Sequence, residues 1–167
     1  GAAIAFPLGQ TTLEDKLSET RNAIKNGADE IDYVVNLTKL KAGDTAYIES
    51  EMARITDICR EFSVVSKVIF ENCYLTEDEK KTLCHIAAKV KPDFIKTSTG
   101  FGTGGATLED VALMKKETEG SGVKIKAAGG IRTLKTALEM IDLGVSRIGS
   151  TSSVAIMEEY MAHSPLL

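Results

Sequence analysis

Four ionisable residues stand in the middle of short apolar runs: Asp32, Lys67, Lys96 and Lys126. The runs are bounded by Gly, Pro or hydroxyl residues, which is typical of buried strands. Because side chains alternate along a strand, Lys96 shares a face with Phe94. A single such lysine is commonly paired or snorkels to water. Four charges on neighbouring strands, each costly to desolvate, instead indicate a functional site.

This set of residues suits imine formation. A free lysine, with a pKa of about 10.4, is almost entirely protonated at pH 7 and is therefore a poor nucleophile. A second ammonium nearby and loss of solvation both lower the pKa of a lysine, which makes more of the amine nucleophilic. We predict that Lys96 is the nucleophile, that Lys126 on the next strand is the perturbing charge, and that Asp32 relays protons.

Glycine-containing turns follow three of the predicted strands. Residues 129–132 (Gly-Gly-Ile-Arg) and 149–153 (Gly-Ser-Thr-Ser-Ser) each stand between a strand and a helix, and Gly100 follows the Lys96 strand. Glycine lets backbone N–H groups approach an anion, and helix N-termini favour negative charge. Either of the first two turns alone is equally well explained by tight chain reversal. Together the three turns favour a phosphorylated substrate.

The chain alternates six times between apolar runs and amphipathic stretches. The predicted strands are residues 2–8, 31–35, 64–70, 94–97, 123–128 and 145–149. The predicted helices begin near residues 12, 45, 76, 107, 133 and 152, mostly at hydroxyl residues that can cap a helix. Strands that are apolar on both faces and alternate with helices indicate a parallel sheet covered by helices. The local pattern does not choose between a doubly wound sheet and a barrel, although no Gly-x-Gly-x-x-Gly motif follows the first strand, which disfavours a dinucleotide fold.

Composition excludes several classes of protein. The 167 residues carry 20 basic and 24 acidic side chains, so no basic footprint for nucleic acid is present. No apolar run approaches the roughly 20 residues that span a membrane. Cys59, Cys73 and Cys84 are odd in number and unclustered, which indicates a reducing, cytoplasmic location. His85 and His163 lack a spaced Cys or His partner, so no metal site is expected.

The chain resembles deoxyribose-phosphate aldolase, a family of class I aldolases. The resemblance is carried, in the family's order, by residues 6–9 (FPLG), 27–32 (GADEID), 67–69 (KVI), 94–100 (FIKTSTG), 126–132 (KAAGGIR) and 147–149 (RIG). The lysine-strand segment and the lysine with its double-glycine turn are the specific ones. Residues 6–9 alone would be a weak signal.

The resemblance implies a role for each site residue. Lys96 would form the Schiff base, Lys126 would lower its pKa, Asp32 would shuttle protons through a bound water, and Lys67 would belong to the supporting charge network. The phosphate would be surrounded by Gly100, Gly129, Gly130, Arg132, Gly149, Thr151 and Ser152. The implied reaction joins acetaldehyde and glyceraldehyde 3-phosphate, reversibly, to 2-deoxyribose 5-phosphate. It belongs to deoxyribonucleotide catabolism and needs no metal or other cofactor, and the enzyme would be a cytoplasmic homo-oligomer.

The family fold is a TIM barrel of the (β/α)8 type, which takes about 250 residues. This chain provides six βα units, of which the first matches the family's third, so we expect residues 1–167 to form a single partial barrel domain lacking the first two units. An open sheet of this kind would leave two edges with unpaired backbone groups. Two rival interpretations follow: a non-catalytic sugar-phosphate binder, or a remnant that assembles only with a partner chain supplying the absent strands.

Overall fold

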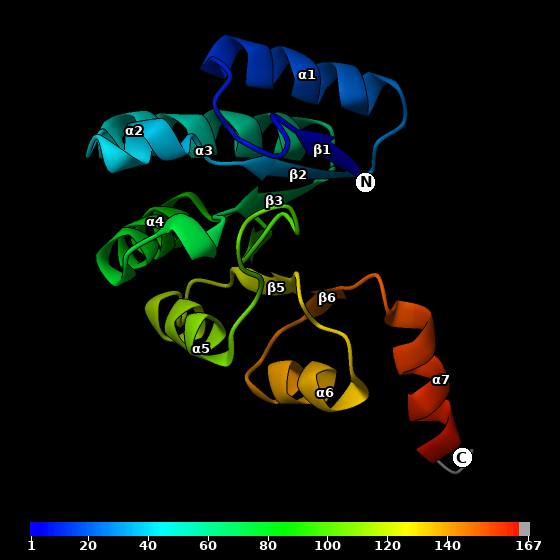
Figure 1. Ribbon diagram of the computed structural model, residues 1–167. Helices are drawn as coiled ribbons and strands as arrows, with labels where there is room; N and C mark the ends of the chain where they lie inside the picture. The colour runs from blue at the N-terminus through cyan, green and yellow to red at the C-terminus, as the bar shows by residue number, and fades with distance from the viewer. Residues whose placement is uncertain (164–167) are drawn as a thin grey trace.

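The computed structural model describes residues 1–163 (Figure 1). Six parallel strands form one sheet in the order of the sequence: β1 (Ala2–Ile4), β2 (Glu30–Val34), β3 (Val65–Ile69), β4 (Phe94–Lys96), β5 (Lys124–Ala128) and β6 (Arg147–Gly149). Each strand lies beside its neighbours in the sequence. A doubly wound sheet would reverse this order at a switch point. The strand order therefore selects the barrel over the doubly wound sheet.

Helices connect the strands, as parallel pairing requires. They are α1 (Leu13–Lys25), α2 (Leu37–Lys41), α3 (Thr45–Glu61), α4 (Glu77–Val90), α5 (Leu108–Glu117), α6 (Leu134–Asp142) and α7 (Ser153–His163), with a short 3-10 helix, η1 (Asn72–Tyr74). In Figure 1 the helices follow one another around the outside of the sheet, from α1 at the top past α4 and α5 to α6 and α7. No helix within residues 1–163 has the length and apolar character needed to cross a membrane.

Side-chain caps fix where the helices begin. Thr12, Thr76, Thr107 and Thr133 each accept a hydrogen bond from the backbone N–H three residues further on. At α4 the cap is reciprocal, because the Glu79 carboxylate also accepts the N–H of Thr76. Each cap contributes about 1 kcal/mol. The predicted hydroxyl caps are therefore confirmed at four helices.

The two faces of the sheet carry side chains of different polarity. Ile31, Tyr33, Val68, Ile95 and Ile125 face the helices, and all are at most 1% exposed. The alternate residues of the same strands point to the opposite face and include the four predicted ionisable residues. An apolar layer thus lies between strands and helices, whereas charged side chains occupy the inner face.

The inner face is concave. Arg147 of β6 donates to both carboxylate oxygens of Glu30 on β2, at 2.6 and 2.7 Å. Three strands separate β2 from β6 in the sheet, so a flat sheet would hold them about 19 Å apart, beyond the reach of these two side chains. The sheet must therefore curl, as a segment of a barrel does.

Local structure differs from the prediction by more than one residue in three places. The first strand was predicted to span residues 2–8 but ends at Ile4, because Ala5 adopts a left-handed φ of 50° and its carbonyl accepts the N–H of Gly9 instead. The sixth strand pairs only over residues 147–149. The short helix α2 was not predicted. It is capped by Asn36, the residue before the helix, whose side chain accepts the N–H of Lys39.

Candidate active site

The three predicted lysines converge on one carboxylate. Lys96 Nζ and Lys126 Nζ donate to the same oxygen of Asp32, Oδ2, at 2.9 and 2.8 Å. Lys67 Nζ donates to the other oxygen, Oδ1, at 2.6 Å. Because they share one acceptor atom, the amines of Lys96 and Lys126 lie no more than about 6 Å apart. The structure therefore brings all four predicted residues together.

Strand register produces this convergence. Asp32 pairs with Lys67 across β2 and β3, and Lys96 pairs with Lys126 across β4 and β5. Residues paired in a parallel sheet point to the same face, so each pair presents its side chains inward. Lys96 is the last residue of β4, which places its amine at the carboxyl end of the strands, where barrels hold their active sites.

Burial and charge act on Lys96 in opposite ways. Lys96 is 8% exposed, and this burial is the main reason that its pKa is lowered from the ordinary lysine value. The hydrogen bond and negative charge of Asp32 raise the pKa of Lys96, while the charges of Lys126 and Lys67 lower it further. Burial and the two neighbouring ammonium groups outweigh Asp32, so the net effect is a lowered pKa of Lys96. Lys96 thus has the environment of a nucleophilic lysine.

Asp32 remains ionised although it is buried. Desolvation disfavours its charge, but hydrogen bonds from Lys126, Lys67 and Lys96 outweigh that effect and hold the pKa of Asp32 well below its usual range. A carboxylate has enough lone pairs to accept all three amines at once. Asp32 is therefore an acceptor within hydrogen-bonding distance of every amine in the site.

Glu30 and Arg147 extend the charged cluster, and neither was predicted as a site residue. Glu30 Oε2 accepts from Lys67 at 2.8 Å as well as from Arg147. The guanidinium of Arg147 also lies over the ring of Phe94, 5.0 Å from its centroid. Glu30 lies two residues before Asp32 on the same strand, and this spacing was the available signal that they share a face.

A cavity of about 400 Å³ opens beside the two amines. It is lined by Lys96, Lys126 and six of the seven residues predicted for phosphate binding: Gly100, Gly129, Gly130, Arg132, Gly149 and Thr151. Thr99 and Ser150 also line it, although neither was predicted. The seventh residue, Ser152, is not among the lining residues, and its N–H donates to Ser150 Oγ at 2.9 Å. The predicted turns therefore share one cavity with the predicted nucleophile.

Tight backbone packing explains the glycine at position 129, which lines the cavity, and the glycine at position 105, which faces it. Gly129 has a φ of 87°, a left-handed conformation that favours glycine. The facing Gly105 lies so close that a Cβ there would come within 2.2 Å of the Gly129 carbonyl oxygen. The N–H of Ala106 donates to that same carbonyl at 3.0 Å. The segment after β4 is thus fastened to the turn after β5, and together they form one wall of the cavity.

Glu71 fastens the turn that follows Lys96. It is 2% exposed and lies two residues beyond the end of β3. One carboxylate oxygen accepts the N–H of Thr99 at 3.0 Å, and the other accepts the Thr99 hydroxyl. Thr99 and Gly100 both line the cavity. Nothing in the local sequence pattern marks Glu71, because its partner lies 28 residues away.

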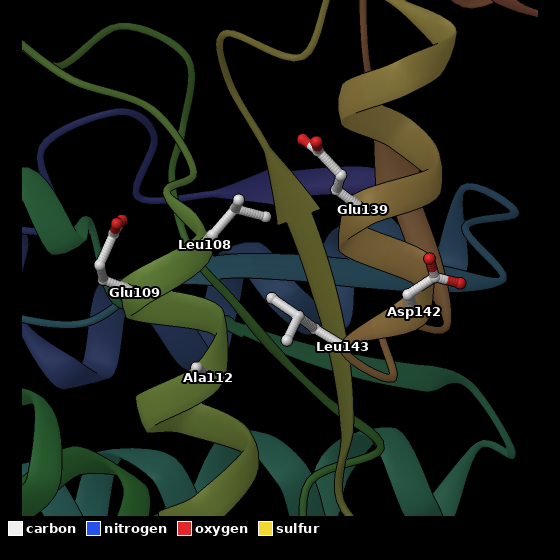
Figure 2. A pocket seen from close by; sticks show the side chains of 6 residues that line it. All are labelled: Leu108, Glu109, Ala112, Glu139, Asp142 and Leu143. Carbon is white, nitrogen blue, oxygen red and sulfur yellow. The ribbon is translucent and has the colours of Figure 1, made fainter.

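A second hollow lies on the outer side of the molecule, between α5 and α6 (Figure 2). Its volume is about 510 Å³, and it is lined by Leu108, Glu109, Ala112, Glu139, Asp142 and Leu143. It shares no lining residue with the lysine cavity. Within residues 1–163, no three His, Cys, Asp or Glu side chains are placed to hold a metal ion. The candidate active site is therefore the lysine cavity.

Fold and site together define a segment of a parallel α/β barrel with a cluster of amines at the carboxyl ends of its strands. Residues 1–151 match the DeoC/LacD family aldolase. The chain is 60% identical over 158 residues to a deoxyribose-phosphate aldolase of Lactobacillus acidophilus, covering 95% of this chain and 66% of that protein. It is 52% identical over 160 residues to the enzyme of the same name from Bacteroides thetaiotaomicron, covering 96% and 67%.

Solved structures of similar fold are also aldolases. An aldolase named QR15 superposes with a TM-score of 0.89 at 42% identity, over 96% of this chain and 71% of that one. A tetrameric deoxyribose phosphate aldolase from Aeropyrum pernix superposes with a TM-score of 0.87 at 29% identity, over 98% and 68%. The chain belongs to the DeoC/LacD family of aldolases, and it spans about two thirds of the length of these curated relatives. The resemblance and the partial TIM-barrel fold predicted from the sequence are both confirmed.

Proposed function

We propose that the protein is a class I aldolase that reversibly cleaves 2-deoxy-D-ribose 5-phosphate to acetaldehyde and D-glyceraldehyde 3-phosphate in deoxyribonucleotide catabolism. The observation that carries the proposal is the oxygen of Asp32 that Lys96 and Lys126 share beside a glycine-lined cavity. The names of the relatives support the choice of reaction. The chemistry follows from where these groups lie.

The first stage forms the imine. The unprotonated amine of Lys96 attacks the aldehyde carbon of the open-chain sugar, so a C–N bond forms and the carbonyl oxygen takes up a proton. Loss of that oxygen as water leaves a protonated imine on Lys96. Asp32 lies 2.9 Å from this nitrogen and can accept and return the protons that move. The charge of Lys126 favours the neutral amine at the start.

The second stage breaks the carbon–carbon bond. The hydroxyl on C3 of the sugar gives up its proton, the C2–C3 bond breaks, and its electron pair moves to C2 to form an enamine on Lys96. Glyceraldehyde 3-phosphate leaves with the new carbonyl at the former C3. Protonation of C2 and hydrolysis of the imine by water then release acetaldehyde and restore the amine. Asp32 is the carboxylate near enough to serve these proton transfers.

The phosphate of the sugar would bind at the glycine-lined end of the cavity. Gly100, Gly129, Gly130, Arg132, Gly149 and Thr151 line the same space as Lys96. Backbone N–H groups in such turns and a nearby guanidinium are suited to a phosphate. We include Ser152 as an outer residue of this set, because it directly precedes α7 and is bonded to Ser150.

Borohydride trapping tests the proposal. Acetaldehyde followed by borohydride should add a stable ethyl group to Lys96, located by mass spectrometry, and Lys96→Leu should abolish it while binding of a phosphate ester persists. Lys135→Leu is the matched control, since that side chain is 85% exposed on α6 and should not affect labelling. Phosphate-ester binding without labelling of Lys96 would identify a sugar-phosphate binder and contradict the aldolase.

We further propose that the protein is a cytoplasmic homo-oligomer and that this chain forms a single domain of it. Cys59, Cys73 and Cys84 are free thiols, as a reducing compartment allows. The Aeropyrum pernix relative is tetrameric. Within the part of the chain that the structure describes, β1 and β6 each pair with only one strand, which leaves backbone groups available to another segment or chain. Light scattering should give a mass well above 17.9 kDa, and a monomer would contradict the proposed assembly.

A further inference from the structure

One ion pair spans the concave face of the sheet and has no part in the steps above. Arg147 on β6 donates to both oxygens of Glu30 on β2, at 2.6 and 2.7 Å. The two residues are 117 positions apart in the sequence, and three strands lie between them in the sheet. Arg147 also covers Phe94 of β4, the strand that carries Lys96.

Glu30 joins this ion pair to the reacting amines. Its Oε2 accepts from Lys67 at 2.8 Å, and Lys67 in turn donates to Asp32 Oδ1 at 2.6 Å. The Lys67 side chain is 1% exposed, so these two carboxylates are its ion-pair partners in a dry environment. With Lys67 on Oδ1, the other oxygen of Asp32 is left to Lys96 and Lys126. Positive and negative groups therefore alternate from Arg147 to Lys96.

We propose that Glu30 and Arg147 are positioning residues of the lysine site, which act through Lys67 to fix the carboxylate of Asp32 beneath the two amines. The catalytic consequence rests on the proposed aldolase function. The effect of Glu30 and Arg147 on the pKa of the Lys96 amine does not depend on that function, and it can be measured without any substrate.

The cluster carries an excess of positive charge. Four cationic side chains (Arg147, Lys67, Lys96 and Lys126) meet two carboxylates (Glu30 and Asp32), while Lys124 lies over Phe94 and Arg132 lines the cavity. Removing a negative charge from this set makes protonation of Lys96 harder, and removing a positive charge makes it easier. Glu30→Gln should therefore lower the pKa of Lys96, and Arg147→Gln should raise it, each by about half a unit to one unit.

Competitive acetylation measures this directly. The protein is treated with trace acetic anhydride from pH 6 to about 11, and modification of Lys96 is followed by mass spectrometry; the protonated amine does not react. We expect opposite displacements of the titration curve in Glu30→Gln and Arg147→Gln, and a native-like curve in Arg147→Lys, which keeps the charge. Arg54→Gln and Glu14→Gln are the matched controls, because they remove the same charges from an exposed pair on α3 and α1 with atoms 3.7 Å apart.

Displacements in the same direction, or no displacement, would overturn the inference, because removing a charge that is coupled to Lys96 through Lys67 and Asp32 must shift the pKa of Lys96 in the direction set by the sign of that charge. Circular dichroism checks that each variant is folded. If Arg147→Gln fails to fold, Glu30→Gln and Arg147→Lys still decide: the first must lower the pKa of Lys96 and the second must leave it in place. Failure of the native protein to be trapped with acetaldehyde would contradict the aldolase function and leave this titration a valid test.

Discussion

A single carboxylate organises the chemistry of the site. Asp32 accepts hydrogen bonds from three amines, two of them on one oxygen. Its charge alone would keep Lys96 protonated, yet burial and the ammonium groups of Lys67 and Lys126 act the other way. The same residue thus has two separable effects on Lys96: it raises the pKa of the amine, and it provides a proton acceptor within 2.9 Å of it.

Asp32→Asn should separate these two effects. Turnover should fall by roughly 10²–10⁴, because the proton relay is lost. Trapping of acetaldehyde on Lys96 should persist and extend to lower pH, because the amide removes the charge that raises the pKa of the lysine. Steady-state kinetics and borohydride labelling as functions of pH measure the two outcomes. Asp57→Asn on the exposed face of α3 is the control. Unchanged turnover in Asp32→Asn would remove Asp32 from the mechanism.

At the scale of elements, the strands are short, and the turns that follow them line much of the cavity. Each of these turns is held in place by hydrogen bonds of its own. β4 contains only Phe94–Lys96, and the chain beyond it is held by Glu71, which accepts both the N–H and the hydroxyl of Thr99. Glu71 itself adopts a left-handed φ of 55°, which is uncommon for a residue with a side chain. The position of the turn at Thr99 is therefore set by Glu71, which lies two residues beyond β3 and outside the turn's own sequence.

Glu71→Gln should weaken recognition of the phosphate more than the chemistry at Lys96. An amide cannot accept two hydrogen bonds from Thr99 with both of its polar atoms, and a hydrogen bond to a charged group contributes about 1.5–3 kcal/mol. We expect KM for the phosphorylated sugar to rise roughly tenfold, with little change in borohydride trapping of acetaldehyde. Kinetics with 2-deoxyribose 5-phosphate and 2-deoxyribose provide the comparison. An equal loss for both sugars, or any effect in the exposed control Glu119→Gln, would contradict this role.

A buried ion pair fastens two helices to the strand that carries Asp32. Lys16 on α1 donates to Glu51 on α3 at 2.6 Å and to the carbonyl of Val34 at 2.8 Å, and Glu51 accepts the N–H of Asn36 at 3.0 Å. Both charged side chains are fully buried. Desolvation lowers the pKa of Lys16 and raises that of Glu51, so each side chain depends on the other for its charge.

Lys16→Met should destabilise the protein by about 3–5 kcal/mol, because it leaves an unpaired carboxylate in an apolar layer. The double variant Lys16→Met/Glu51→Leu should recover part of the lost stability, since it also removes the unpaired carboxylate of Glu51. Urea denaturation of the native protein, both single variants and the double variant gives the coupling between the two residues. Additive effects of the two substitutions would show that the pair does not act as a unit.

At the scale of the whole molecule, the convergence of Asp32, Lys67, Lys96 and Lys126 could be predicted from local alternation and parallel pairing. The barrel order of the strands could not be read from the local pattern, and it was expected only from the family resemblance. The parts that escaped prediction are contacts between distant segments. Arg147 meets Glu30 only because the sheet curls, and Glu71 meets Thr99 because the neighbouring strands β3 and β4 bring the segments that follow them together. Curvature is a property of all six strands together, so no window of sequence contains it. The short helix α2 escaped because five residues hold too little periodicity to detect.

The ion pair between Glu30 and Arg147, which the curled sheet brings together, makes the stability of the fold sensitive to acid. Hydrogen bonds from Arg147, and then from Lys67, lower the pKa of Glu30 to about 2 from an ordinary value of 4.5. The folded protein therefore binds this proton less readily than the unfolded chain does. The stabilisation from ionised Glu30 is complete above about pH 4.5 and is lost as the pH falls toward 2. Asp32, whose pKa is also lowered, adds to the loss over an acidic range of its own.

Glu30→Gln should make the stability of the protein depend less strongly on pH in the acidic range. Because the substituted amide carries no charge at any pH, the variant should be less stable than the native protein at pH 6, and the difference should shrink between about pH 4.5 and pH 2. Urea midpoints measured at half-unit steps across this range give the two curves. Glu14→Gln, on an exposed carboxylate of α1, should reproduce the native curve. Parallel curves for the native protein and Glu30→Gln would show that protonation of Glu30 is not coupled to folding, and that the pair joining β2 to β6 does not hold the sheet in its curled form.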